Sequence, residues 1–236
     1  MADGLYLGMA GATARAAQLD SIADNLANAQ TPGFKPARPA FESFLAESGA
    51  ADKVYAAAVG TGIDMRPGQA VHTGNPLDVL PEGDGLLAVR TASGATAFTR
   101  AGRLTLDPSG QLLAAGLPVL DPRGEPVLIP PQTNPEIAKD GTLSAEGREF
   151  GKVALWRAEG PMGRNGPQLL VPGDNTKVAL VPDGTLRVGE LELGSYTPLE
   201  ATVQLVEAQR QFDSTMQALQ TYRTLDQRAV EVGRIR

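Results

Sequence analysis

The sequence predicts an α+β protein in which long helices at the two ends flank a central all-β domain. Helical periodicity marks residues 1–35 and 197–236, and short apolar runs separated by turn motifs mark residues 54–196. Residues 36–53 are expected to be a linker, because 46–53 are small and charged. We therefore expect a discontinuous terminal helical domain whose helices pair as a coiled-coil-like layer, together with one central β domain.

The N-terminal helix carries a narrow seam of apolar residues at alternating steps of four and three. The seam consists of Leu5, Met9, Ala12, Ala16, Leu19, Ala23 and Leu26. This spacing is typical of helices that pack against other helices. The helix is expected to end near Ala29, because Pro32 disfavours helical geometry at Thr31 and Gly33 accepts a positive φ angle.

The C-terminal helix has a clear start signal, since residues 197–200 read TPLE, a capping box with proline at the first helical position. Its apolar face contains Leu205, Phe212, Met216 and Leu219. Gly233 is the expected stop. Stripes this narrow bury well only against other helices, so we expect the two ends to pair with each other and with helices of other copies. The alternative is two ordinary helices lying on a β domain.

The central region is punctuated by turn chemistry. Residues 107–110 and 121–124 both read D-P-x-G, with residue types that suit successive positions of a β-turn. They predict a meander of short strands. Residues 177–193 are expected to form a hairpin around Pro182-Asp183-Gly184. Trp156 is the largest single candidate for the core.

Composition excludes several classes of function. Asp and Glu number 27 against 21 Lys and Arg, which argues against general affinity for nucleic acid. No apolar run approaches the roughly 20 residues that a membrane span needs. The chain has no cysteine and one histidine, His72, so a thiol or histidine cluster for catalysis or metal binding is not expected. The N-terminus lacks the pattern of a cleaved secretory signal.

Two weaker motifs are better explained without a ligand. Residues 83–88 fit G-x-G-x-x-A, but a dinucleotide site needs a helix after this motif and "LLAVRT" predicts a strand. The acidic residues Asp64, Asp78, Glu82 and Asp84 lack the spacing of a calcium loop. We therefore expect no catalytic residues, no cofactor, no metal and no small-molecule substrate.

Residues 25–35, NLANAQTPGFK, resemble the signature at the start of bacterial flagellar rod and hook proteins. The motif residues are Asn25, Leu26, Ala27, Asn28, Thr31, Gly33 and Phe34. The resemblance continues, in the same order, at residues 73–89 (TGNPLDVLPEGDGLLAV), 98–120 (FTRAGRLTLDPSGQLLAAGLPVL) and 205–213 (LVEAQRQFD). The short centre and "RPAFESFL" favour the proximal rod type of this family, followed by the distal rod type.

The resemblance implies a non-enzymatic structural subunit of the flagellar basal-body rod. It implies export without a cleaved signal through the flagellar type III apparatus, and polymerisation in the periplasm with other copies and other rod subunits. The terminal helices would line the export channel and help to transmit torque. The T-P-G-F break would turn the chain out of the helical layer, with Phe34 and Phe41 anchoring the outgoing segment.

Other interpretations stay open at this point. A distal rod or hook subunit would share the same motifs, although a hook protein would carry a larger middle. A β-domain enzyme or carbohydrate binder decorated with helices would need a pocket with convergent polar groups. A cytoplasmic coiled-coil adaptor would form a small oligomer of fixed stoichiometry.

Overall fold

The chain divides into two compact units, each assembled from segments that are distant in sequence. The computed structural model describes the backbone of residues 2–45, 54–130 and 133–234, and the side chains of residues 9–38, 62–130, 133–225, 227 and 228. The first unit contains residues 1–27, 37–61 and 198–236, and the second contains residues 28–36 and 62–197. The polypeptide therefore passes from one unit to the other several times.

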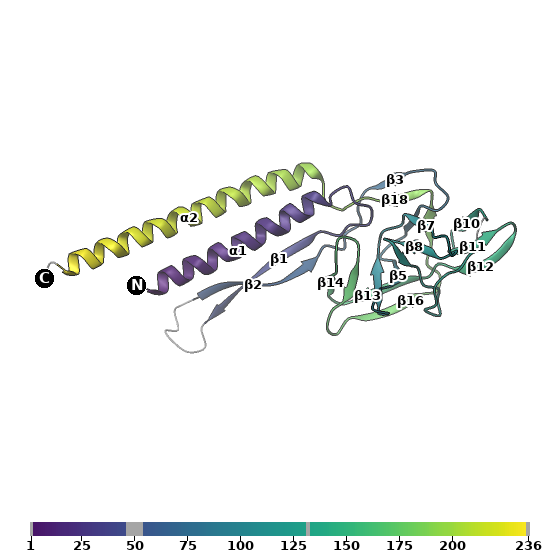
Figure 1. Cartoon of the computed structure of the whole chain (residues 1–236), viewed down its shortest axis with the longest axis horizontal. Coiled ribbons are helices and arrows are strands. Elements are labelled where there is room, and N and C mark those ends of the chain that lie inside the picture. Colours follow the sequence, from purple (N-terminus) through teal and green to yellow (C-terminus); the bar gives the residue numbers. More distant parts are fainter. Residues whose placement is uncertain (1, 46–53, 131–132, 235–236) are drawn as a thin grey trace. The chain divides into compact units, whose positions relative to one another are not determined.

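The first unit is built around two long helices. Helix α1 (Ala2–Ala27) and helix α2 (Pro198–Arg234) lie side by side and run in opposite directions (Figure 1). Strand β1 (Ala37–Leu45) packs along α1 and pairs with β2 (Val54–Ile63). The predicted α+β class, with a helix at each end and a β-rich centre, is confirmed. The predicted start of the second helix at residue 198 is also confirmed.

The expected linker differs from the structure over residues 37–45, where β1 forms instead. This stretch reads ARPAFESFL, and its aromatic residues have a high propensity for strands once a partner strand is available. That partner is β2, which begins after residue 53. Residues 46–53, the most linker-like part of the range, lie outside the described residues.

The largest sheet of the second unit has the strand order β14-β15-β6-β5-β13-β16, with antiparallel pairing between neighbours. Its strands are β14 (Met162–Arg164), β15 (Leu170–Pro172), β6 (Thr96–Thr99), β5 (Leu86–Arg90), β13 (Leu155–Glu159) and β16 (Lys177–Val181). Segments from residues 86 to 181 thus meet in one sheet, which makes this unit rich in long-range contacts.

Smaller antiparallel sheets complete the second unit. Two of them have three strands each: β7 (Leu104–Leu106), β8 (Leu112–Ala114) and β9 (Leu117–Pro118); and β10 (Pro135–Ile137), β11 (Thr142–Ala145) and β12 (Arg148–Lys152). Two further sheets are strand pairs: β4 (Val79–Pro81) with β17 (Leu186–Val188), and β3 (Ala70–His72) with β18 (Glu190–Glu192).

The predicted D-P-x-G turns are confirmed, and the predicted hairpin over residues 177–193 is wrong. Gly110 and Gly124 donate from their backbone N–H groups to the carbonyls of Asp107 and Asp121, both at 3.0 Å. In contrast, β16 pairs with β13, and β17 pairs with β4. The chain does turn after Val181, but the strands on either side of the turn pair with strands from elsewhere in the sequence and not with each other. Local turn chemistry therefore identified the turn but not the pairing.

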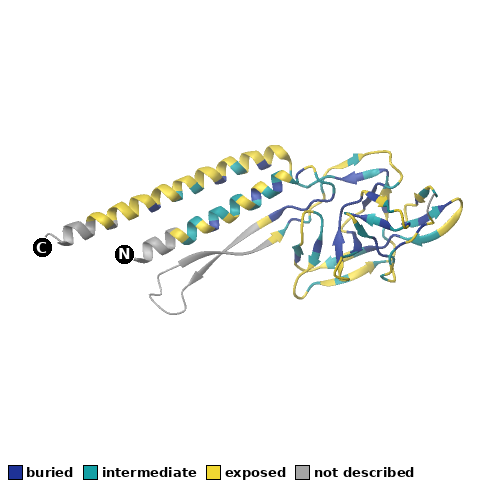
Figure 2. Ribbon diagram, viewed as in Figure 1, coloured by how far each residue is buried: buried dark blue, intermediate teal, exposed yellow. Residues whose placement is uncertain are grey.

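Two apolar clusters form the core of the second unit. The larger one contains Val79, Leu87, Val89, Ala97, Leu104, Leu112, Ala114, Val119, Val127, Ile129, Ile137, Leu143, Val153, Leu155 and Leu186. The smaller cluster includes Leu86, Phe98 and Leu120, with Trp156 packed against it and edge-on to Phe98 at a ring separation of 6.4 Å. Figure 2 shows that buried residues are dense on these strands, whereas the described part of α2 is largely exposed.

Replacement of Leu112 by Ala should destabilise the second unit by about 2–5 kcal/mol, because Leu112 is fully buried and its truncation leaves a cavity. Leu128→Ala is the matched control, since that side chain is 57% exposed and should cost about 0.5 kcal/mol or less. Urea unfolding followed by Trp156 fluorescence measures both changes. Equal losses in the two variants would contradict the core assignment.

Candidate assembly site

The described residues offer no sign of a catalytic or metal centre. Among them, no group of three His, Cys, Asp or Glu side chains gathers as a ligand set. Residues 83–88 lead into strand β5, as expected, and His72 is exposed. No helix within the described ranges contains a stretch long and apolar enough to cross a membrane. The site of interest is therefore the pair of terminal helices and the motif that joins α1 to the second unit.

The predicted seam of α1 is only partly covered in a single chain. Met9 is 49% exposed and Ala23 is exposed, whereas Ala12, Ala16, Leu19 and Leu26 are half-buried. The side chain of Leu5 lies outside those described. Among the side chains of α1 that the structure describes, the most buried are instead Ala14, Ile22 and Asn25.

Asn25 explains why the buried face of α1 differs from the apolar seam. Its amide Nδ2 donates to the carbonyl of Ala37 at 2.9 Å, and its Oδ1 accepts from the Ala37 N–H at 3.0 Å. Ser21 Oγ donates to the same carbonyl at 3.4 Å. These bonds bind the last turns of α1 to the start of β1. A seam counted from apolar residues alone could not include a polar residue that pairs with backbone.

Helix α2 has a regular stripe of covered residues at steps of four and three. The stripe contains Ala201, Leu205, Ala208, Phe212, Thr215 and Leu219, of which Ala201, Ala208 and Leu219 are buried and the others half-buried. Three of the four predicted positions, Leu205, Phe212 and Leu219, lie on it. The fourth, Met216, is 38% exposed, and Thr215 occupies the place on the stripe.

The T-P-G-F segment belongs to the second unit, where it forms tight turns and binds a side chain of a distant segment. Thr31 N donates to Asn28 O at 2.9 Å, and Phe34 N donates to Thr31 O at 3.2 Å, so the segment forms tight turns directly after α1. Gln168 Nε2 donates to Pro32 O at 2.9 Å. Within the motif, Leu26 is half-buried and Ala27 is exposed, so the motif as a whole combines turn-forming, packing and exposed positions.

Gly33 occupies a position that no other residue fits. Its φ angle is +71°, which confirms the predicted left-handed conformation. A Cβ atom there would lie 2.2 Å from Ala101 N and 2.3 Å from the carbonyl carbon of Arg100. Gly33 N also donates to the backbone carbonyl of Glu192 at 2.8 Å. The motif thus requires glycine both for its backbone angle and for close approach.

Phe34 follows and is fully buried, so its predicted anchoring role is consistent with its position in the second unit. The guanidinium carbon of Arg164 lies 5.2 Å from the centre of its ring, a cation–π contact. The side chain of Phe41, the other predicted anchor, is outside those described.

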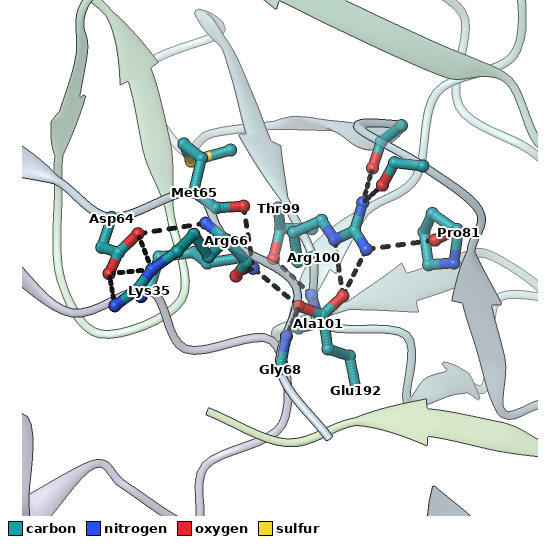
Figure 3. Close-up of polar contacts among 12 residues, drawn as sticks. Lys35, Asp64, Met65, Arg66, Gly68, Pro81, Thr99, Arg100, Ala101 and Glu192 are labelled. Atoms are coloured by element: carbon teal, nitrogen blue, oxygen red, sulfur yellow. Dashed lines mark hydrogen bonds and ion pairs between the residues drawn. The ribbon is translucent and has the colours of Figure 1, made fainter. Parts of the chain in front are cut away.

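Lys35, Arg100 and Glu192 form a buried ion network next to this segment (Figure 3). Their side chains are 1%, 5% and 2% exposed. Glu192 Oε1 accepts from Lys35 Nζ at 2.6 Å and from Gly68 N at 2.8 Å. Glu192 Oε2 accepts from Arg100 Nε at 2.8 Å and also from Arg100 Nη2. One carboxylate therefore binds both cations.

The network leaves no hydrogen-bonding capacity of its cations unused. Beyond Glu192, Arg100 donates to the carbonyls of Gly83 and Gly85, each at 2.7 Å, and to that of Pro81 at 3.1 Å. Lys35 Nζ also donates to the carbonyls of Arg66 at 2.7 Å and Met65 at 3.4 Å. A buried charge needs this degree of pairing, because desolvation is costly for any ion without partners.

The network shifts two pKa values. Burial lowers the pKa of Lys35, and Glu192 opposes this shift only in part. Burial alone would raise the pKa of Glu192, but the charges of Arg100 and Lys35 and the hydrogen bonds to its carboxylate together lower it below its ordinary value of 4.5. Glu192 is thus held as a carboxylate although its side chain is buried.

Sequence reasoning did not single out Arg100 or Glu192. Both have mainly apolar neighbours in the sequence: Arg100 follows the buried strand β6, and Glu192 lies between Leu191 and Leu193. A charge in a segment that otherwise belongs to a core is a usable signal for a buried ion pair. The partners could not be identified, because they are 92 residues apart.

Comparisons with known proteins agree with the sequence motifs. A family profile described as "Flagella basal body rod protein" matches residues 5–35, and one described as "Flagellar hook protein FlgE/F/G D1 domain" matches residues 82–145. The flagellar basal-body rod protein FlgF of Salmonella typhimurium is 32% identical over 231 residues, which cover 91% of this chain and 92% of the relative. This chain belongs to the flagellar basal-body rod protein family.

Further relatives refine the assignment. FlgF of Caulobacter vibrioides is 30% identical over the whole of both chains, and the rod protein FlgG of Bacillus subtilis is 29% identical over 98% of each. The rod subunit therefore resembles FlgF first and FlgG next, as predicted for a proximal rod type. It is a structural subunit of the flagellar basal-body rod and not an enzyme.

In this rod subunit, Gly33→Ala should lower the free energy of unfolding of the second unit by about 2–4 kcal/mol. The left-handed φ costs about 1 kcal/mol for alanine, and the clash with the backbone at residues 100–101 adds about 1–3 kcal/mol. Gly74→Ala is the control, because Gly74 has a φ of +72° and a Cβ added there would have no other atom within 4 Å. Denaturant titrations measure both, and a Gly33 loss no larger than the Gly74 loss would refute the packing argument.

Acid should weaken the rod subunit in part through Glu192. Its folded pKa lies below its unfolded value, so the unfolded state binds more protons between the two and falling pH favours unfolding. Over the acidic range, the difference in free energy of unfolding between wild type and Glu192→Gln should shrink as pH falls below 4.5. Asp107 and Asp140 also have lowered pKa values, but they are present in both proteins and cancel. A difference that stays constant down to acidic pH would contradict this account.

Proposed function

We propose that this rod subunit polymerises through α1 and α2 to form part of the drive shaft that transmits torque and encloses the export channel. In this proposal the terminal helices pair as a coiled-coil-like layer with helices of neighbouring copies. The observation that carries the proposal is the amount of apolar side chain that α1 and α2 leave exposed in a single chain.

Seven large apolar side chains of the two helices are exposed among the described residues. They are Met9 on α1 and Leu199, Val203, Val206, Met216, Tyr222 and Leu225 on α2. Leu199, Val203 and Val206 follow at steps of four and three, on the side of α2 opposite its covered stripe. A contiguous exposed apolar surface is characteristic of protein–protein contact. The predicted α1 seam, which is only partly covered over its described residues, is assigned to the same contacts.

Repetition supplies the stiffness that a drive shaft requires. Each Leu or Met that becomes buried on assembly contributes roughly 1.5–3 kcal/mol, and the same contact recurs at every copy. Heterologous contacts that do not close into a ring extend instead into a helical filament. Modest contacts in parallel therefore suffice for a rigid shaft.

The proposed partners are other copies of this chain and other rod subunits of the flagellar basal body. Relatives that carry the name basal-body rod protein, both FlgF and FlgG, support this choice. We further propose delivery by the flagellar type III export apparatus without a cleaved signal and a periplasmic position in the rod. No nucleic-acid contact, membrane insertion or small-molecule substrate is part of the proposal. A distal rod role is the alternative that the FlgG relatives support.

Leu19→Asp or Val203→Asp should reduce incorporation into the rod at least about tenfold, because loss of about 1.4 kcal/mol at a contact already weakens it tenfold. The second unit should stay folded, as judged by Trp156 fluorescence during thermal unfolding. Basal bodies purified from cells that express each variant, together with swimming assays, measure incorporation.

The control for this experiment is Gln209→Asp, which places the same charge at an exposed polar position of α2. It should incorporate and support swimming normally. Normal incorporation of both Leu19→Asp and Val203→Asp would overturn the assignment of these helices to subunit contacts.

A further inference from the structure

A single carboxylate joins segments of the second unit that are far apart in sequence. Glu192 binds Lys35, Gly68 N and Arg100 across 157, 124 and 92 residues respectively. Lys35 follows the segment that enters the second unit from α1, and Glu192 precedes the segment that leaves it for α2. The network is therefore the point where the first segment of the second unit, residues 28–36, meets the C-terminal end of its second segment.

Without Glu192, the rest of the network would be electrostatically unfavourable. Lys35 and Arg100 would be two buried cations in the same place, and the charge of Arg100 already acts against protonated Lys35 when Glu192 is present. Their backbone acceptors at Arg66, Gly83 and Gly85 carry only partial charges. Removal of one partner from a buried ion network is strongly destabilising for this reason.

The backbone around Glu192 is bound at the same point. The carbonyl of Glu192 accepts from Gly33 N at 2.8 Å, and Leu193 N donates to Gln69 O at 2.9 Å. Strand β18 pairs with β3 through Leu191 opposite Val71 and Glu192 opposite Ala70. Residues 190–193 thus combine, in one short segment, the pairing with β3, the bond to Gly33 N and the counter-charge of both buried cations.

We propose that the contacts of Glu192 with Lys35, Gly68 and Arg100 form last during folding and thereby close the second unit. We call this set of contacts the latch. Contacts that span the longest loops pay the largest closure entropy before they contribute, so they tend to form after local turns and hairpins. A chain that emerges N-terminus first would then hold the second unit open until residue 192 is available. This proposal does not depend on how the helices assemble.

The order of protection in the wild-type chain tests the latch directly. In refolding followed by pulsed hydrogen exchange, the amides of Gly33 and Gly68, which both donate to Glu192, should become protected last. The amides of Leu112 and Val119, in and next to the meander of strands β7–β9, should become protected earlier, because they donate to the carbonyls of Val127 and Leu112, which are close in sequence. Protection of Gly33 and Gly68 together with or before the meander amides would overturn the proposal.

Stopped-flow kinetics of a variant provides an independent test, with Trp156, the single tryptophan of the chain, as a reporter of the second unit. Glu192→Gln should unfold about a hundredfold faster or more, with a refolding rate within about threefold of wild type, because a contact formed after the transition state affects unfolding alone. Glu190→Gln is the control: Glu190 pairs with the exposed Arg187, and both rates should change little.

Refolding of Glu192→Gln that slows as much as unfolding accelerates would refute late docking. If Glu192→Gln does not fold, Lys35→Met tests late docking instead. It removes one cation and leaves the Arg100–Glu192 pair, whose net charge is zero. The same partition is expected for it, with faster unfolding and unchanged refolding. An unchanged unfolding rate in Lys35→Met would count against the latch.

Discussion

The buried carboxylate of Glu192 and its two cations are the constraint on which the second unit depends. An ion that is withdrawn from water is tolerated only when every hydrogen bond it can make is satisfied, and this network meets that requirement through side chains and backbone carbonyls together. Such a network adds less stability than an apolar core of the same volume would, but its geometry admits few alternatives. Its value lies in fixing where the two ends of the unit meet.

The T-P-G-F segment fixes the path of the chain next to this ion network. Gly33 approaches the backbone at Arg100 and Ala101 so closely that a side chain cannot fit, and the next residues place Phe34 in the core and Lys35 on Glu192. On the other side of the motif, Asn25 binds the backbone of Ala37. The order of helix, turn and buried cation therefore follows from steric and electrostatic needs at neighbouring positions, rather than from any requirement of chemistry on a substrate.

The two units differ in how they obtain their stability. The second unit contains a continuous apolar core with fully buried residues such as Leu112 and Leu143. The helices of the first unit have narrow covered stripes and several exposed apolar side chains, so a single chain satisfies only part of their surface. Under the proposed function, one unit is folded by its own core and the surface of the other is completed by neighbouring subunits.

The sequence by itself determined the elements that depend on local chemistry: both terminal helices, the start of α2 at Pro198, the turns at Asp107 and Asp121, and the left-handed angle at Gly33. Its four motifs also determined the family. Only the tertiary structure decided that residues 37–45 form a strand, that β16 and β17 pair elsewhere, that Asn25 lies on the buried face of α1, and that Glu192 meets Lys35 and Arg100. Capping, turn geometry and periodicity act over a few residues, whereas strand pairing and ion pairing over a hundred residues depend on which partners the rest of the fold brings within reach.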